Sequence, residues 1–293
     1  MKITRVACQD NPQVVVIGSL TEDQVVHDGT RTRQIGGVVW YAGTTLARLG
    51  VKTRVVTRTA SKDRELSKTL EAAGVEIRLG SSAQTTTFVN EYTANIQAGR
   101  TQRVLAMADS IQASDLEEAL TDADLVYLGP LHPMDLSDGA LSLVKRKGSF
   151  SLALDVQGYT RFVQNERVLP RLDARLPSLL DACDVIKASE EEACLITGLS
   201  NASSAAVNLA RSHPCLEVVV TCGAKGAYVA QYERISFVKS KNIVVSDTTG
   251  AGDVFFASYL AHRIKRRLTR RAAELAIDFT ARWLADPDRN AML

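Results

Sequence analysis

The sequence lacks several patterns that would place it at once in a common class. Its five cysteines are scattered and include no C-x-x-C pair, which argues against a disulfide framework or a zinc site and favours a reducing compartment. No stretch approaches the roughly 18 consecutive apolar residues of a membrane span, and no apolar run follows the charged N-terminal residues. The net charge is only +2, so the molecule offers no field for a polyanion. We therefore expect a soluble, cytoplasmic protein that binds neither membrane nor nucleic acid.

Motifs of several nucleotide- and metal-binding classes are also missing. The histidines show no ligand spacing such as H-E-x-x-H, and no G-x-x-x-x-G-K-[ST] sequence occurs, so an ATP site here is not a P-loop. Residues 250–255 lack the third glycine of the dinucleotide-binding fingerprint, which counts against a dehydrogenase. A basic run at residues 263–271 has no aromatics nearby to stack on bases, and basic side chains also suit a helix C-terminus. We interpret that run as a solvated face.

What the sequence contains favours an α/β protein. Of its 293 residues, 45% are hydrophobic and 23% are charged, which is ample for a core in one large domain or two small ones. Short β-branched runs alternate with segments of helical periodicity. The expected strands cover residues 14–17, 54–57, 86–89, 125–128, 151–155, 184–187, 217–221, 227–230 and 243–246. The expected helices cover residues 38–49, 62–73, 140–147, 190–197, 203–212 and 254–264. This order predicts a mostly parallel sheet with helices on both faces, and ligands beyond the carboxyl ends of its strands.

Two segments, around residues 20–35 and 84–106, break this alternation. The first has a strand-like run with a turn at Asp28-Gly29, and the second has two strand-like runs that flank residues 94–100, a pattern typical of a hairpin. Such strands have no helix to cover them, so we predict a small β-rich lid or dimer surface. The alternative is a pair of surface excursions without function.

The most informative stretch is residues 247–253, with the sequence D-T-T-G-A-G-D, which lies between a strand-like and a helix-like segment. Its glycines let the backbone turn tightly and bring N–H groups close to a ligand. The helix start adds unpaired donors and a positive dipole end, which favour an anion such as phosphate. Asp253 is expected in the first helical turn, where a carboxylate beside a phosphoryl group can take the proton from a substrate hydroxyl. The alternative is plain turn chemistry, with Asp253 an ordinary carboxylate of a helix N-terminus.

This string resembles the C-terminal signature D-T-x-G-A-G-D of the ribokinase-like (PfkB-type) carbohydrate kinase family. The resemblance implies that Asp253 is the catalytic base and that the amides of Gly250, Ala251 and Gly252 form the anion hole. It also implies a ribokinase-like three-layer α/β sandwich over residues 1–293, as a single domain with a small β lid.

A set of residues nearer the N-terminus resembles the family's acceptor site. A carboxylate can accept hydrogen bonds from vicinal hydroxyls, and glycine amides allow close approach, so by resemblance Asp23, Gly36 and Gly37 bind the acceptor. By themselves, these residues also fit a surface carboxylate and a turn. The family usually has Asn four residues after the second glycine, where this chain has Tyr41, and the change counts against a ribose pocket. Tyr41 and the segment at residues 155–161 are more similar to the myo-inositol kinase-like branch.

The segment from Ser189 to Glu192 resembles the family's N-x-x-E motif, with serine in place of asparagine. By resemblance, Ser189 lies at the cofactor site and Glu192 holds the Mg²⁺ of ATP through water. One such carboxylate is physically adequate, since Mg²⁺ commonly keeps several waters. The alternative is a plain capping box, Ser-x-x-Glu, at a helix start.

A strand–turn sequence, V-V-V-T-C-G-A-K-G-A, resembles the family segment that borders the nucleotide. The resemblance places Thr221, Gly223 and Gly226 beside ATP, and it is compatible with a simple hairpin turn between two strands. Many members of the family also have a monovalent-cation site. By resemblance, that site implies K⁺ near Asp247 and Thr249 in this chain.

These motifs occur in the family's order along nearly the whole chain. They predict an ATP- and Mg²⁺-dependent kinase that transfers the γ-phosphoryl group to a hydroxyl of a small sugar, cyclitol or nucleoside, and that forms a homodimer through its lid. Two alternatives are a non-catalytic relative that binds nucleotide or sugar as an interaction module, and a nucleotide-dependent enzyme of another class, such as a dehydrogenase.

Overall fold

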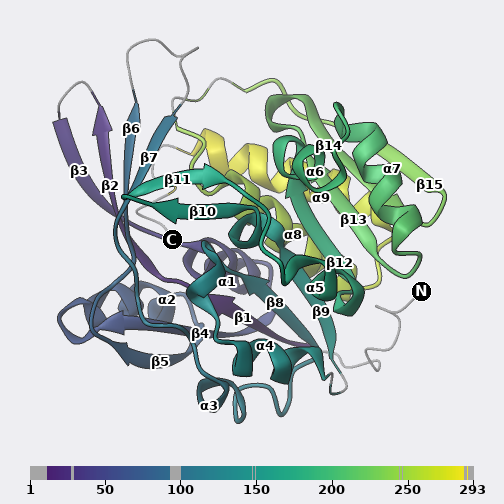
Figure 1. Ribbon diagram of the computed structural model, residues 1–293. Coiled ribbons are helices and arrows are strands. Elements are labelled where there is room, and N and C mark those ends of the chain that lie inside the picture. The colour runs from purple at the N-terminus through teal and green to yellow at the C-terminus, as the bar shows by residue number, and fades with distance from the viewer. Residues whose placement is uncertain are drawn as a thin grey trace.

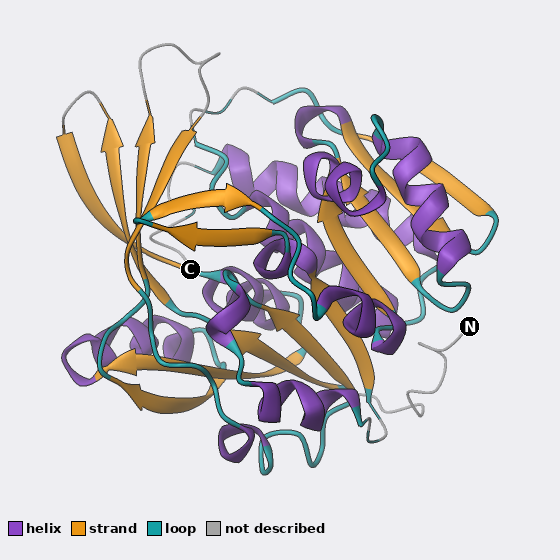
Figure 2. Ribbon diagram, in the orientation of Figure 1, coloured by secondary structure: helices purple, strands orange, loops and turns teal. Residues whose placement is uncertain are grey.

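The computed structural model describes residues 12–27, 30–92, 100–146, 148, 150–243, 245, 247–286 and 289. This part of the chain forms two β-sheets, and helices cover both faces of the larger one (Figures 1 and 2). The larger sheet has nine strands among the described residues, in the order β15-β14-β13-β12-β9-β8-β1-β4-β5. Their bounds are β1 Gln13–Gly18, β4 Lys52–Ala60, β5 Glu76–Ser82, β8 Leu125–Gly129, β9 Ser151–Asp155, β12 Val185–Ser189, β13 Glu217–Thr221, β14 Gly226–Gln231 and β15 Arg234–Lys239.

The pairing within this sheet is mostly parallel, as the sequence predicts. From β13 to β5 every neighbouring pair is parallel, whereas β14 and β15 continue the sheet as antiparallel strands. The helices are α1 Val38–Arg48, α2 Lys68–Ala72, α3 Ala113–Leu116, α4 Asp138–Lys145, α5 Leu176–Ala182, α6 Glu190–Thr197, α7 Ala202–Ser212, α8 Ala251–Ile264 and α9 Thr269–Ala285. The expected α/β sandwich with a mostly parallel central sheet is therefore confirmed.

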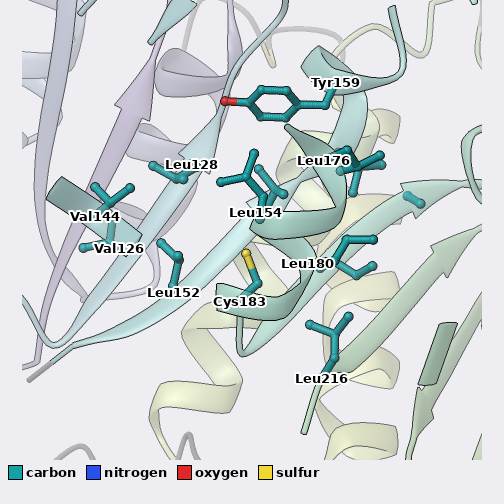
Figure 3. Packing of buried hydrophobic residues seen from close by; sticks show 14 of the residues in the cluster. Val126, Leu128, Val144, Leu152, Leu154, Tyr159, Leu176, Leu180, Cys183 and Leu216 are labelled. Carbon is teal, nitrogen blue, oxygen red and sulfur yellow. The ribbon is translucent and has the colours of Figure 1, made fainter. Parts of the chain in front are cut away.

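The core lies on both faces of the larger sheet, because its central strands are apolar on both sides. In β1, Val14 and Val16 pack in the cluster that contains α1, α8 and α9 residues. Val15 and Ile17, which point the other way, pack in the cluster formed with α4, α5 and α7 residues, part of which Figure 3 shows. Burying such a side chain contributes about 1.5–3 kcal/mol, so a strand buried on both faces is held firmly.

The smaller sheet has six strands among the described residues, in the order β10-β11-β7-β6-β2-β3. Their bounds are β2 Thr21–His27, β3 Thr30–Gly36, β6 Thr87–Tyr92, β7 Arg100–Ala106, β10 Arg161–Gln164 and β11 Arg167–Pro170. The chain enters this sheet just after β1 and again just after β9, so the sheet lies at the carboxyl edge of the larger one (Figure 1). The strands expected around residues 20–35 and 84–106 are present here, while the turn at Asp28-Gly29 and residues 94–99 lie outside the described residues.

Two expected elements differ from the structure. The helix at residues 62–73 is divided into a 3₁₀ helix, Ser61–Ser67, and the short α2, because the segment presents only a narrow buried stripe. The strand at residues 243–246 is wrong for its described residues: Ile243 and Val245 belong to no strand and line a cavity instead.

The basic run is only partly the solvated face that the sequence suggested. Lys265, Arg266 and Arg267 are exposed. Arg263, however, makes a paired contact with Glu217 at the start of β13, through Nε–Oε1 at 2.8 Å and a second guanidinium nitrogen to Oε2 at 2.7 Å. The hydroxyl of Tyr259 also donates to Glu217. These bonds fasten the C-terminal half of α8 to the larger sheet.

Candidate active site

The glycine-rich loop before α8 forms a site suited to an anion. Gly250 caps α8 with a left-handed backbone, φ 78°, a conformation that favours glycine. The amide of Ala251 donates to the carbonyl oxygen of Thr248 at 3.1 Å, which closes the turn. Because the first N–H groups of a helix have no partner within it, the amides of Gly252 and Asp253 are the donors that this helix end presents, together with its positive dipole end.

Asp253 lies in the first turn of α8 and is partly exposed. Burial raises the pKa of its carboxyl to about 7. The positive charge of Lys187 opposes this rise in pKa, and the negative charge of Asp155 adds to it. More weakly, Arg161 opposes the rise and Glu192 adds to it. Asp253 therefore has two cations and two carboxylates as electrostatic neighbours, and a pKa suited to proton transfer near neutral pH.

Lys187 and Asp155 form a buried ion pair at the centre of the site. The Nζ of Lys187 lies 2.6 Å from Oδ2 of Asp155, and both side chains are under 10% exposed. Burial alone would lower the pKa of Lys187, but the charges of Asp155, Glu192 and Asp253 raise it above its ordinary value, so the ammonium stays charged. A Cβ placed on Gly252 would come within 3.4 Å of Nζ. The ammonium of Lys187 is therefore close to Gly252, in the glycine-rich segment at residues 247–252, which we call the anion loop.

Sequence analysis gave no role to Asp155 or Lys187, although both lie in segments that it considered. The available signal was a single lysine inside the apolar run of β12, where an unpaired charge would be costly. Its partner could not be identified from the sequence, since the parallel register that aligns Lys187 with Asp155 joins strands 32 residues apart.

Ser189 and Glu192 form the capping box that was the alternative to a metal role. The Oγ of Ser189 accepts from the amide of Glu192 at 3.2 Å, and Oε2 of Glu192 accepts from the amide of Ser189 at 2.8 Å. Burial raises the pKa of Glu192, and Lys187 opposes that shift. Among the described residues no group of three or more His, Cys, Asp or Glu side chains is placed to hold a metal. This donor set fits a Mg²⁺ that is bound mainly by phosphates and water, with Glu192 as the carboxylate that the family resemblance assigns to it.

A cavity of about 600 Å³ opens between β13, β14, α8 and α9. Its lining includes the predicted nucleotide residues Ser189, Thr221, Gly223 and Gly226, together with Thr248 and Gly252. Its apolar lining is formed by Ile243, Val245, Phe255, Ile277, Ala281 and Leu284. A phosphate chain suits the first set of residues and a flat base suits the second.

The predicted acceptor residues also come together. Gly36 lies opposite Thr21 in the β2–β3 register, and a Cβ on it would overlap the side chains of Thr21 and Asp23. Gly37, φ 89°, caps α1, and a Cβ there would overlap the carbonyl oxygen of Ser19. Both glycines are therefore required by close contacts, and they bring the Asp23 carboxylate of β2 beside the junction of β3 and α1.

Tyr41 is at the site but is buried rather than open to a ligand. Its ring lies against Gly250, where a side chain would overlap it, and it makes edge contacts with Trp40 and Trp283. Burial is the largest cause that raises the pKa of Tyr41, followed by the charges of Asp23 and others. This burial favours a role beneath the anion loop over direct contact with the acceptor.

A polar row on the smaller sheet was not anticipated from the sequence. Asn90 lies opposite Val25, which puts it on the same face of the sheet as Asp23. Gln102 donates to Oδ1 of Asn90 at 2.9 Å and accepts from Arg161 at 3.3 Å. The Nδ2 of Asn90 is buried and has no hydrogen-bond partner within the described part of the chain. A second cavity, of about 770 Å³, adjoins this row at Gln102 and Arg161 and reaches Glu192.

Asp247, predicted near a monovalent-cation site, makes contacts with Thr249 and Arg289. One of its carboxylate oxygens accepts from the amide of Thr249 at 2.8 Å, and the other lies 3.2 Å from the guanidinium of Arg289. The same guanidinium nitrogen donates to the main-chain carbonyl oxygen of Asp247 at 2.9 Å.

The fold and this site define a phosphotransferase with a hydroxyl acceptor. A family model described as pfkB family carbohydrate kinase matches residues 8–280, so the chain belongs to that family. This membership decides against the dehydrogenase alternative. Within the described residues, no helix is long and apolar enough to span a membrane.

Individual relatives agree with this assignment. A fructokinase of Klebsiella pneumoniae is 29% identical, with 96% of this chain and 95% of that protein covered. A fructokinase of Rhizobium leguminosarum bv. trifolii is 26% identical over 94% of this chain and 86% of its own length. A solved pyrophosphate-dependent kinase of the ribokinase family, complexed with a pyrophosphate analogue and myo-inositol, superposes with a TM-score of 0.84 at 26% identity, covering 94% of this chain and 96% of that one.

Proposed function

We propose that this chain transfers the γ-phosphoryl group of ATP to a hydroxyl of a small sugar, cyclitol or nucleoside, with Asp253 as the general base. The observation that carries the proposal is the place of Asp253: it follows the anion loop in the first turn of α8, and its pKa is raised to about 7. An acid with that pKa is largely ionised at slightly alkaline pH and still holds a transferred proton well enough to assist the reaction.

In the proposed reaction, the acceptor oxygen forms a bond to the γ-phosphorus while the bond to the bridging oxygen of ADP breaks. The acceptor hydroxyl gives its proton to Asp253. The first-turn amides of α8 and the ammonium of Lys187, which lies under Gly252, face the charge on the transferred group.

Magnesium would supply charge neutralisation on the β- and γ-phosphates when bound with ATP. Glu192 is the residue proposed to order its water, from the start of α6. Its carboxylate already accepts from the Ser189 amide, which fixes its direction.

The apolar lining of the cavity of about 600 Å³ supports ATP as donor. Phe255, Ile277 and Leu284 offer a surface for adenine that pyrophosphate would leave without a partner. Pyrophosphate is the second candidate donor, because the solved relative described above depends on it.

The acceptor is proposed to lie between Asp253 and the smaller sheet. Asp23, Asn90 and Gln102 share one face of that sheet and provide the acceptors and donors that a polyhydroxylated ring requires. We propose that this sheet is a lid over a single domain spanning the chain, and that it also supplies a homodimer contact. A lid would exclude water and limit wasted hydrolysis of ATP.

A donor and acceptor screen tests the proposal. ADP release with Mg·ATP would be measured against fructose, ribose, the inositols and nucleosides, and phosphate release with magnesium pyrophosphate against the same panel. Turnover with ATP and one acceptor, lost in Asp253→Asn, is the expected result. Turnover with pyrophosphate alone would select the second donor, and failure with every pair would contradict the kinase.

A further inference from the structure

The guanidinium of Arg289 contacts two oxygens of Asp247, one in its carboxylate and one in its main chain. One of its guanidinium nitrogens lies 3.2 Å from the Oδ2 of Asp247 and donates to the main-chain oxygen of the same residue at 2.9 Å. The two side chains are only 13% and 18% exposed. A carboxylate oxygen and a carbonyl oxygen side by side are hard ligands of the kind that bind alkali and alkaline-earth cations. In this chain a guanidinium occupies them.

The position of Arg289 is itself fixed by the end of α9. Its amide donates to the carbonyl oxygen of Asp286 at 3.2 Å, and its guanidinium carbon lies 5.5 Å from the ring centroid of Trp283. Trp283 in turn meets the edge of Tyr41 with centroids 6.0 Å apart, and the Tyr41 ring lies against Gly250. Arg289 therefore supports the anion loop at two points, directly at Asp247 and through two aromatic rings at Gly250.

The residues present do not fit a monovalent cation in addition to this arginine. A potassium ion near Asp247 and Thr249 would need the same oxygens and would lie beside the guanidinium of Arg289. Like charges at such a separation repel strongly where solvent is largely excluded.

We propose that Arg289 replaces the monovalent cation as a fixed positive charge beneath the anion loop, so that this kinase works without K⁺. Arg289 is thus a positioning residue: it holds residues 247–250 in the form that directs the first-turn amides of α8 at the phosphoryl group. The proposal rests on the kinase function above for its activity readout, and on protein stability for an independent one.

The first test exchanges the salt. At constant ionic strength, replacing KCl by tetramethylammonium chloride is expected to leave both the melting temperature and the rate with the acceptor found in the screen unchanged within about twofold, since a ligand without a site shifts nothing. A melting temperature that rises with KCl concentration but not with tetramethylammonium chloride would overturn the proposal, even in the absence of any known acceptor.

The second test changes the arginine. Arg289→Met keeps an unbranched chain against Trp283 but removes the charge, and we expect kcat to fall by up to about 10²-fold through misplacement of the loop. The loss should be restored in part by K⁺ and not by tetramethylammonium, and Arg289→Lys should retain most of the rate. Arg282→Met, an exposed change near the end of α9, is the matched control.

The outcomes separate this inference from the proposed function. If no acceptor is turned over, the stability of Arg289→Met still decides: a melting temperature that K⁺ raises in the variant but not in the wild type supports the replacement. An Arg289→Met protein with wild-type rate and no response to K⁺ in rate or stability would overturn it.

Discussion

Asp253 is the residue whose substitution most directly tests the proposed chemistry. Asn has the same shape but cannot accept the proton, so we expect Asp253→Asn to lower kcat by about 10²–10⁴-fold. Mg·ATP should still raise the melting temperature of the variant, because the loop and the donor cavity remain. Steady-state kinetics and a thermal-shift titration measure the two effects, and a near-normal rate would remove Asp253 from the role of base.

The raised pKa of Asp253 also predicts how stability depends on pH. Its folded-state pKa of about 7 lies above the ordinary value, so between these values the folded protein binds more protons than the unfolded one. The free energy of unfolding therefore falls as the pH rises through this window, by the linkage of proton binding to folding. Asp253→Asn removes the charge that burial disfavours.

We accordingly expect Asp253→Asn to melt at a higher temperature than the wild type at pH 8, with the difference shrinking toward pH 4. Thermal melts across this range give the measurement. A difference that does not change with pH would show that Asp253 is not the group whose ionisation opposes folding. The same pKa predicts that kcat/KM rises with pH up to about 7 in the wild type and then levels off.

At the scale of elements, the start of α6 has two functions that substitution can separate. Ser189→Ala removes the oxygen that accepts from the Glu192 amide and should cost about 1 kcal/mol of stability, the usual value of an N-cap. Glu192→Gln keeps an oxygen for the Ser189 amide but loses the charge, so we expect a raised Mg²⁺ requirement. Magnesium titrations of both variants test this, and an unchanged titration in Glu192→Gln would leave the capping box as its only role.

The face of α9 that lines the cavity of about 600 Å³ determines the donor if adenine binds there. Ala281→Phe would fill part of its apolar lining, and we expect the KM for ATP to rise at least tenfold, which corresponds to about 1.4 kcal/mol of lost contact. Turnover with magnesium pyrophosphate, if the wild type has any, should be unaffected. A KM for ATP that does not change would move adenine out of this cavity. Arg282→Met serves again as the control.

Element prediction succeeded where sequence pattern and burial agree. The buried strands β1, β8 and β12 are short apolar runs, and α8 begins at the glycines that the D-T-T-G-A-G-D string placed there. The strand expected at residues 243–246 is absent among its described residues, because Ile243 and Val245 line a cavity instead. A local pattern of β-branched residues cannot distinguish burial against a cavity from burial in a sheet. The motif residues could be identified from the sequence because their roles depend on the conformation of the local backbone.

Over the whole molecule, the missed site residues are those fixed by distant pairing. Lys187 meets Asp155 through strand register, Gln102 meets Arg161 across 59 residues, and Arg289 reaches Asp247 from beyond α9. No spacing in the sequence encodes such contacts. The lid and the dimer remain predictions.

The lid can be tested through exchange of backbone amides. With acceptor and a non-hydrolysable ATP analogue bound, we expect slower hydrogen exchange in β2 and β6, whose Asp23 and Asn90 share the sheet face proposed for the acceptor, and little change in β14 and β15. Equal protection in both sheets, or none in β2 and β6, would contradict a lid that orders around the acceptor.

The anchoring of α8 by Glu217 bears on how the two substrates could meet. This helix carries Asp253 at one end, while Tyr259 and Arg263 fix its other half to the sheet that also bounds the donor cavity. If Asp253 is the base and ATP the donor, as proposed, both share one rigid frame. In that case the acceptor would be the partner that moves, brought by β2 and β6 toward a stationary carboxylate.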